Sequence, residues 1–396
     1  MDSKIIMIAA IALTGCGSSP RGTGIGVIGN PLIGQTSLYN NYGTETNQVF
    51  VVDKSTNRML GVKLDSMTMT HEFELSHPEV EHSVAIDTNE NFVIDFSKSH
   101  LQVISMDGTR TDKPFKFTGT PIASAYNPLT RTMIMEDDVY SVGLMKFTAT
   151  GGVASSWLGG PTIATGKTIS AGDLDSTGRL ILAMTDGSFS VVDVDQSISK
   201  ESWQSSNFAT TLKSVDSVAP DTSSTDLSLV SSSTAVGVVN VATQAVTESQ
   251  TISPYSRAVS KAGKPHVITK ASIDSDYTMY YINASGAMTT YTLKDTGIGT
   301  YSKSYLSSDA TKFSVLLDVE TDKYRHMYQV RALVVRLSDG LVLHDRTITA
   351  KGAVSMDSQY LFVNQDAALG RLQLFDMETD DVKTIEGYNF NYLRTH

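Results

Sequence analysis

The sequence predicts an all-β fold, a β-propeller of eight blades with four antiparallel strands each; seven blades are the alternative. Variants of one hairpin, QVFVVDKSTNRMLGVKL at Gln48 to Leu64, return about every forty to fifty residues up to the C-terminus. The 396 residues are 40% hydrophobic, which is enough for one large core. Abundant Ser, Thr, Val and Gly suit many short strands joined by turns. Such a period in an all-β chain is typical of a propeller.

The repeated hairpin has a simple pattern. Val49 and Val51 alternate in a strand that ends at Asp53, a turn follows, and Met59 to Leu64 forms the returning strand. The pattern recurs in LQVISMDGTR (Leu101 to Arg110), FSVVDVDQS (Phe189 to Ser197), AVGVVNVATQ (Ala235 to Gln244), MYYINASGAM (Met279 to Met288), LVVRLSDGLVL (Leu333 to Leu343) and LQLFDMETDD (Leu372 to Asp381). Each copy predicts one pair of neighbouring strands in a blade.

In chain order, the units begin at Ser37. The first unit has three strands, Ser37 to Tyr42, Gln48 to Asp53 and Met59 to Leu64, and lacks an opening strand. Seven full units follow near residues 82–117, 122–160, 169–205, 214–252, 257–293, 304–348 and 353–387. Tyr388 to Leu393, YNFNYL, alternates in polarity where the next innermost strand would begin. We therefore predict that this C-terminal strand completes the first blade and closes the ring.

Residues 1–15 have the composition of an export signal. Lys4 supplies a minimal positive region, and Ile5 to Leu13 is an apolar run too short to span a membrane as a mature helix. The sequence LTGC at 13–16 resembles the lipobox of bacterial lipoproteins, whose Cys is lipidated on sulfur and becomes the new N-terminus. The resemblance implies that Cys16, the only Cys in the chain, carries acyl chains such as palmitate. A buried Cys16 at the start of a hydrophobic helix is the alternative.

Residues 16–36 are expected to hold the domain away from the bilayer. The stretch that follows Cys16 is rich in Gly, Ser, Asn and Pro and carries little charge, which is typical of a flexible tether. In many lipoproteins of this kind an Asp after the Cys retains the protein at the inner membrane. Gly17 and Ser18 stand there instead, which by resemblance implies the outer membrane, on its periplasmic face or at the cell surface. The propeller is then expected to span residues 37–396.

The strand-and-turn pattern resembles the YVTN type of β-propeller repeat. In that repeat a strand ends in V-x-D and a T-x-(T/N)-(G/N) turn follows. The segments that carry the pattern here are VVDKSTN, VVDVDQS and LFDMETD. The resemblance extends loosely over most of the chain and implies the propeller fold.

The charge balance excludes one class of partner. The chain has 31 Lys and Arg against 42 Asp and Glu, a net charge of −11. Nucleic acid requires a basic stripe that displaces counterions from its phosphates, and anionic lipid likewise attracts basic segments. We therefore expect no nucleic-acid partner, and we expect membrane contact through the lipid on Cys16.

The densest group of metal-capable side chains lies in HEFELSHPEVEH, residues 71–82. His71, His77 and His82 alternate there with Glu side chains and are weak candidates for a Zn²⁺ or Cu²⁺ site. We expect the segment to join the last strand of one blade to the first strand of the next. Its spacing matches no standard ligand motif, so a solvated polar loop is the alternative and no metal site is assigned.

DLDSTGR at 173–179 superficially resembles a Ca²⁺ loop, because alternate acidic side chains can converge on one ion. The bidentate Glu of such a loop is missing, since residue 184 is Met. We expect Asp173 and Asp175 to end a strand and start a turn, with Gly178 at positive φ. The same interpretation, a turn repeated in successive blades, applies to Asp193 with Asp195, Asp274 with Asp276 and Glu378 with Asp380.

The sequence assigns no catalytic residue, ligand-binding residue or cofactor. It holds no GxSxG, HExxH or GxxxxGK motif. We expect a non-enzymatic protein-interaction scaffold or binding module in the bacterial envelope, anchored through Cys16 and bound to an envelope protein. The alternative is a propeller hydrolase or lactonase whose polar groups, with or without a metal, meet in the central channel from several blades. A distributed site of that kind would leave no local motif.

Overall fold

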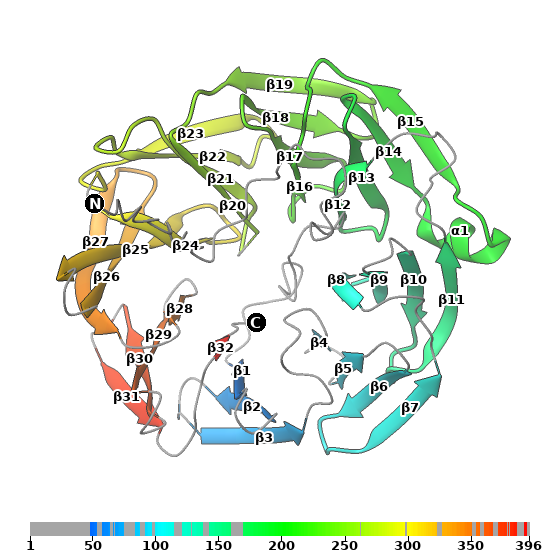
Figure 1. Cartoon of the computed structure of the whole chain (residues 1–396), viewed down its shortest axis with the longest axis horizontal. Helices are drawn as coiled ribbons and strands as arrows, with labels where there is room; N and C mark the ends of the chain where they lie inside the picture. The colour runs from blue at the N-terminus through cyan, green and yellow to red at the C-terminus, as the bar shows by residue number, and fades with distance from the viewer. Residues whose placement is uncertain are drawn as a thin grey trace, which may run out of the picture.

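The computed structural model describes residues 48–53, 58–63, 66, 68–74, 84–87, 92–96, 100–114, 121–127, 129–137, 142–159, 169–261, 263–297, 299–322, 327–350, 354–356, 360–366, 371–377, 379, 381–385 and 392–393. These residues form eight four-stranded antiparallel sheets around a common centre, together with one short helix (Figure 1). The predicted β-propeller is confirmed, with eight blades and not seven.

The strands of each blade are given from the centre of the ring outwards. Blade 1 comprises β32 (Tyr392–Leu393), β1 (Gln48–Asp53), β2 (Arg58–Lys63) and β3 (Thr68–Glu74). Blade 2 comprises β4 (Val84–Asp87), β5 (Phe92–Phe96), β6 (His100–Ser105) and β7 (Arg110–Pro114). Blade 3 comprises β8 (Pro121–Asn127), β9 (Thr132–Asp137), β10 (Val142–Phe147) and β11 (Val153–Gly159). Blade 4 comprises β12 (Ile169–Leu174), β13 (Leu180–Met184), β14 (Ser188–Val192) and β15 (Ser205–Ala209).

The second half of the ring repeats this order. Blade 5 comprises β16 (Ser217–Pro220), β17 (Leu227–Ser231), β18 (Ala235–Asn240) and β19 (Ala245–Thr251). Blade 6 comprises β20 (Ser256–Ser260), β21 (His266–Lys270), β22 (Tyr277–Ile282) and β23 (Met288–Leu293). Blade 7 comprises β24 (Thr300–Leu306), β25 (Lys312–Asp322), β26 (Met327–Arg336) and β27 (Leu341–Ala350). Blade 8 comprises β28 (Val354–Met356), β29 (Tyr360–Asp366), β30 (Arg371–Asp376) and β31 (Val382–Ile385).

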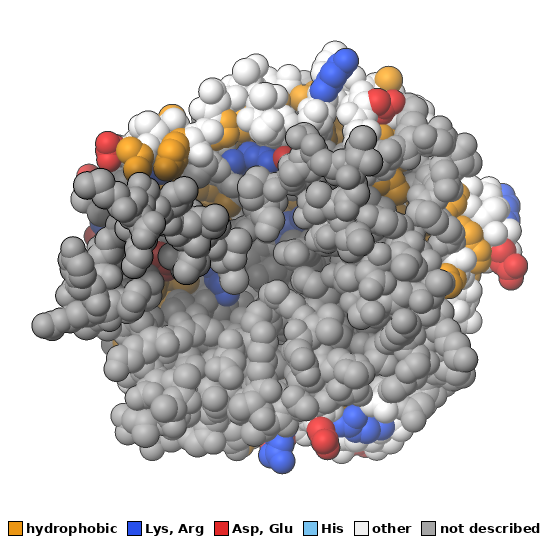
Figure 2. Space-filling view, in the orientation of Figure 1, with side chains coloured by type: hydrophobic (Ala, Val, Ile, Leu, Met, Phe, Trp, Pro, Cys, Tyr) orange, Lys and Arg blue, Asp and Glu red, His pale blue; other side chains and the backbone are white. Residues whose placement is uncertain are grey.

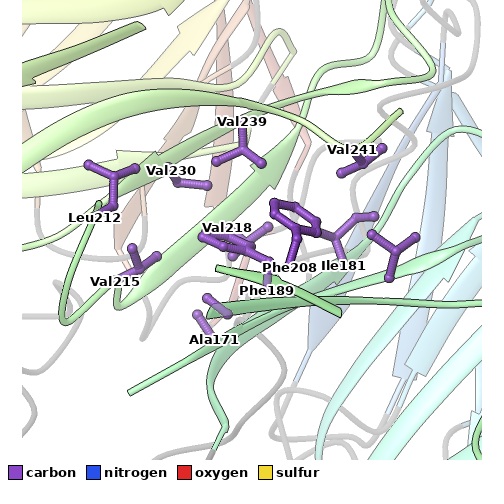
Figure 3. Packing of buried hydrophobic residues seen from close by; sticks show 12 residues of the cluster. Ala171, Ile181, Phe189, Phe208, Leu212, Val215, Val218, Val230, Val239 and Val241 are labelled. Atoms are coloured by element: carbon purple, nitrogen blue, oxygen red, sulfur yellow. The ribbon is translucent and has the colours of Figure 1, made fainter. Parts of the chain in front are cut away.

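The core lies between the faces of successive blades. The middle strands β13 and β14 are buried at every position, because blades cover both of their faces, whereas the outer strand β19 is mostly exposed. Between blades 4 and 5, Phe189 stacks on Phe208 with ring centroids 5.7 Å apart. Figure 3 shows these rings among the valines that blade 5 contributes to the same cluster. Burial of this apolar surface holds neighbouring blades together.

The ring closes through strands from both ends of the described chain. Val51 and Val52 of β1 pair antiparallel with Leu393 and Tyr392 of β32, which is the innermost strand of blade 1. The predicted closure by a C-terminal strand is therefore confirmed. The predicted strand at Ser37 to Tyr42 lies outside the described residues. Its predicted place as one of the four strands of blade 1 is wrong, because β32 pairs directly with β1 and β3 is the fourth strand.

The local structure predicted for two further segments was also wrong. Residues 71–74 were expected in a loop, but they belong to β3, the outer strand of blade 1. The alternation of buried and exposed side chains typical of a strand is hard to recognise there because most of the residues are charged or polar. Phe73 is buried, while Glu72 faces solvent and forms an ion pair with Arg58 of β2.

Asp193 and Asp195 were expected in a turn, but a helix, α1 (Val194–Lys200), stands there. The Asp193 side chain caps it by accepting from the Gln196 N–H at 2.9 Å, and Asp195 pairs with Lys146 of blade 3 at 3.0 Å. The helix therefore braces blade 4 against blade 3.

Deletion of residues 388–396 should destabilise the ring, because it removes β32 and leaves the inner edge of β1 without its partner. The two described residue pairs alone should contribute about 1–3 kcal/mol. Urea denaturation followed by circular dichroism measures the loss. An unchanged midpoint and slope would contradict closure by β32.

Candidate functional site

A cluster of buried charges lies where the inner strands of blades 4 to 7 converge. Its centre is the segment from Lys261 to His266, which joins β20 to β21 and is called the clasp here. The side chains of Lys261, Lys264 and His266 are all buried. Figure 2 shows several Lys or Arg side chains near the centre of the ring. The clasp therefore supplies three of the seven buried Asp, Lys and His side chains among the described residues.

Lys261 connects blade 6 to blade 4. Its Nζ donates to Oδ2 of Asp173, which lies on β12 and is 88 residues away in the sequence. Burial raises the pKa of Asp173, and the charge of Lys261 opposes that shift. The pair reaches past the inner strand of blade 5, so it fixes the spacing of two blades that are not neighbours.

Lys264 connects blade 6 to blade 5. Its Nζ donates to Oδ1 of Asp221 at 2.8 Å and to the Ser223 hydroxyl at 2.6 Å. The Lys264 and Asp221 side chains are each only 2% exposed. An ion pair without water compensates the loss of hydration only when the geometry is good and the remaining donors are satisfied. Ser223, which also donates to Oδ2 of Asp221 at 2.7 Å, meets part of that need.

The backbone of the clasp is held against blade 7. The Lys264 N–H donates to the Leu306 carbonyl at 2.7 Å, and Gly263 forms a parallel bridge with the same residue. Gly263 has φ of 67°, and a Cβ there would meet the Leu306 oxygen at 1.9 Å. Only glycine fits this close approach.

His266 completes the junction with blade 7. Its Nδ1 lies 2.8 Å from the Lys264 carbonyl, so this nitrogen carries the proton, and its Nε2 accepts from the Ser304 hydroxyl at 2.6 Å. The Tyr301 hydroxyl lies 2.9 Å from the same Ser304 oxygen. Burial lowers the pKa of His266 to about 4, so the ring is neutral at pH 7.

A second ion pair joins blades 5 and 6 at the opposite end of their inner strands. Arg257 of β20 donates to Oδ2 of Asp216, just before β16, and to the Ser231 hydroxyl at 2.5 Å. Blades 5 and 6 are thus tied at both ends of their inner strands. Every buried ionisable side chain of Asp, Lys or His among the described residues has a protein partner; these are Asp173, Asp175, Asp221, Lys261, Lys264, His266 and Lys270.

The DLDSTGR segment forms the strand end and turn that the sequence predicts. β12 ends at Leu174, and Gly178 has φ of 82°. One carboxylate oxygen of Asp175 accepts from the N–H groups of Thr177 and Arg179, both at 2.9 Å, and the other accepts from Arg179 Nε at 2.6 Å. Asp173 faces Lys261 instead. The two carboxylates therefore serve a turn and a blade-to-blade ion pair.

The predicted site residues are only partly described. Cys16, His77 and His82 lie outside the described residues. His71 lies in β3, where it stacks on Phe73 and its Nδ1 lies 2.9 Å from the Thr70 hydroxyl; burial lowers its pKa. Within the described ranges, no three His, Cys, Asp or Glu side chains gather in a group that could hold a metal. No helix in that part of the chain is long and apolar enough to span a bilayer.

Sequence reasoning missed the clasp. Its segment SKAGKPH, residues 260–266, resembles a polar turn, and the partners of its lysines lie 43 and 88 residues away. The only local signal is a pair of lysines around a glycine between two apolar strands.

Comparison with known proteins supports the fold. No family model and no curated protein matches the chain. It is similar in structure to the dihydro-heme d1 dehydrogenase NirN in complex with DHE, with 12% identity and a TM-score of 0.56 over 87% of this chain and 74% of that one. The WD40 domain of SCAP from fission yeast is 10% identical, with a TM-score of 0.49 over 87% of this chain and 97% of that one. BamB from Moraxella catarrhalis is 12% identical, with a TM-score of 0.48 over 86% of this chain and 94% of that one. At 12% identity, the similarity to NirN supports the propeller fold alone.

Removal of one partner of the clasp should be costly. Lys264→Met leaves Asp221 buried without its cation, and we expect a loss of about 3–5 kcal/mol in the free energy of unfolding. Adding Asp221→Asn to the same chain should recover part of that loss. Urea denaturation of both variants measures the effect; a single variant as stable as the unmodified protein would show that the ion pair does not hold the blades.

The buried His266 should make the fold sensitive to acid. Its folded pKa of about 4 lies below the unfolded value of about 6.5, so the unfolded chain binds the proton first and stability falls as pH drops from 6.5 to 4. The full shift corresponds to about 3 kcal/mol. In His266→Gln, which cannot titrate, this part of the pH slope should disappear. Equal slopes for both proteins in urea denaturation would contradict the assignment.

Proposed function

We propose that the chain is a lipid-anchored protein of the bacterial envelope whose propeller acts as a non-enzymatic scaffold for protein binding. Support for the anchor comes from the sequence: the short apolar run, the lipobox-like LTGC at 13–16 and the Gly- and Ser-rich tether after Cys16. The outer membrane is the expected location, because Gly17 and Ser18 follow the Cys.

One observation carries the scaffold proposal. The buried charges of the described blades are used to join blades and turns, whereas the three most exposed large apolar side chains, Tyr255, Ile273 and Leu129, lie on loops. A catalytic centre needs polar groups that are free to meet a substrate, and here those groups bind each other. A binding module needs rigid exposed apolar side chains, and the loops of blade 6 supply them.

The anchor is tested by Cys16→Ser in a bacterial host fed an alkyne-labelled palmitate analogue. We expect the unmodified chain to incorporate the label and to sediment with the outer membrane. Cys16→Ser should lose the label and either leave the membrane or persist as an uncleaved precursor, because each buried methylene of the acyl chains adds about 0.8 kcal/mol of membrane affinity. An unlabelled mature protein that still sediments in high salt would place the anchor elsewhere.

The scaffold role is tested by cross-linking in intact envelopes, followed by purification of the tagged full-length chain. We expect one protein to be cross-linked in amounts comparable to the chain itself. Turnover of lactones or esters by the purified chain, lost when described carboxylates are substituted, would instead favour the hydrolase.

A further inference from the structure

The loops at one end of blade 6 expose two large apolar side chains. Tyr255 is 65% exposed and Ile273 is 62% exposed, the two highest values for large hydrophobic residues in the described part of the chain. The Tyr255 N–H donates to the Lys270 carbonyl at 2.7 Å, and Ile273 follows Lys270 by three residues. Both side chains therefore lie at the same end of the blade, opposite the clasp.

Three loops form a common platform under these side chains: residues 252–255, 271–276 and 294–297. One oxygen of Asp276 accepts from the Thr296 N–H at 2.9 Å and from the Gly297 N–H at 3.0 Å. The buried Lys270 donates to the Gly297 carbonyl at 2.8 Å and lies over the Tyr277 ring. These hydrogen bonds hold the three loops together from beneath. Binding of a partner would therefore cost little entropy for ordering the loops.

The neighbouring blade 7 rises beside the platform. Its strands β25, β26 and β27 have 11, 10 and 10 residues, and the other described strands have at most 7. The last pair between β24 and β25 at this end is Thr300 with Asp318, so β25 continues for four residues, about 14 Å, beyond the inner strand. The projecting ends of these blade 7 strands are called the wall here. Arg331 of β26 donates to the Asp295 carbonyl at 2.6 Å and so joins the wall to the platform.

The charge around the apolar pair is acidic at the surface. Asp274 and Asp295 are exposed and Asp276 is partly exposed, while Lys294 is the only exposed base in the three loops. Two further cations lie nearby: Lys270 is buried beneath the platform, and Arg331 of blade 7 donates to the Asp345 carboxylate as well as to the Asp295 carbonyl. With a net charge of −11 on the whole chain, this surface attracts cations and repels phosphates.

We infer that the platform is the docking surface for a protein segment that presents an apolar side chain flanked by Lys or Arg. Tyr255 and Ile273 contact the apolar side chain, the wall of blade 7 limits the direction of the segment, and Asp274 and Asp295 meet its basic residues. This inference rests on the proposed scaffold function and names the surface that performs it. Such an aromatic anchor with a charged rim is typical of the residues that dominate binding energy.

The test uses short random peptides displayed on phage and selected on the full-length chain in detergent micelles. Selected peptides are then measured on Tyr255→Ser/Ile273→Ser, and on Leu129→Ser as a matched control. Leu129 is 56% exposed in the connection between β8 and β9, which corresponds to the clasp end of blade 6. The side chains of these three residues are mostly exposed, so the variants should keep the melting temperature of the unmodified chain.

We expect the selected peptides to combine an aromatic or aliphatic residue with Lys or Arg. They should bind the double variant at least ~tenfold more weakly than the unmodified chain and bind Leu129→Ser equally well. Asp274→Asn/Asp295→Asn should weaken the same peptides several-fold and reduce their sensitivity to salt. Failure to enrich any peptide, acidic peptides, or equal binding to the double variant would overturn the inference.

The same double variant separates this inference from the scaffold function itself. If the envelope protein found by cross-linking is still captured by Tyr255→Ser/Ile273→Ser, the proposed scaffold function is supported and the assignment of the platform as its docking surface is wrong. If that protein is lost only from the double variant, the platform is the docking site.

Discussion

Two lysines removed from water, Lys261 and Lys264, set the relative positions of blades 4, 5 and 6, and the backbone between them is pressed against blade 7. Each of these two ammonium groups lies beside a carboxylate, and a buried ion pair is stable only while its two partners keep that geometry. Apolar packing between blades is non-directional. The ion pairs add contacts between particular atoms of blades 4, 5 and 6 to that packing.

Much of the fold could be predicted because every blade must bury the same kind of sheet in the same way. A four-stranded sheet with two apolar faces must pack between two others, so the hairpin pattern returns with the blade and marks its bounds. The missing first strand and the alternating C-terminus predicted closure for the same reason. The outer strand β3 was missed because its alternation, with Phe73 inward and Glu72 outward, lies among charges that resemble a loop. The helix α1 was missed because Asp193 is equally suited to a turn and to a helix cap.

The clasp could not be predicted from the sequence. Lys264 and Asp221 belong to different repeats, and no local pattern indicates that a lysine is buried. The platform is similar: Tyr255 and Ile273 are unremarkable alone, and only the loop contacts through Lys270 and Gly297 show that they share one rigid surface. Both features depend on contacts across the ring, whereas the sequence reports what is near in the chain. The same limit explains why Cys16 was predicted: its motif is local.

The described charges have two roles: the buried ones join blades, and those on the platform are proposed to bind a partner. Hydrogen exchange read by mass spectrometry tests the first half most directly, because the inner strands β12, β16, β20 and β24 should open together if the clasp joins them. Substitution of Asp173 by Asn should accelerate exchange in all four strands, including β24 of blade 7, while β8 in blade 3 changes little. Acceleration confined to β12 would contradict the central claim that the clasp couples the blades.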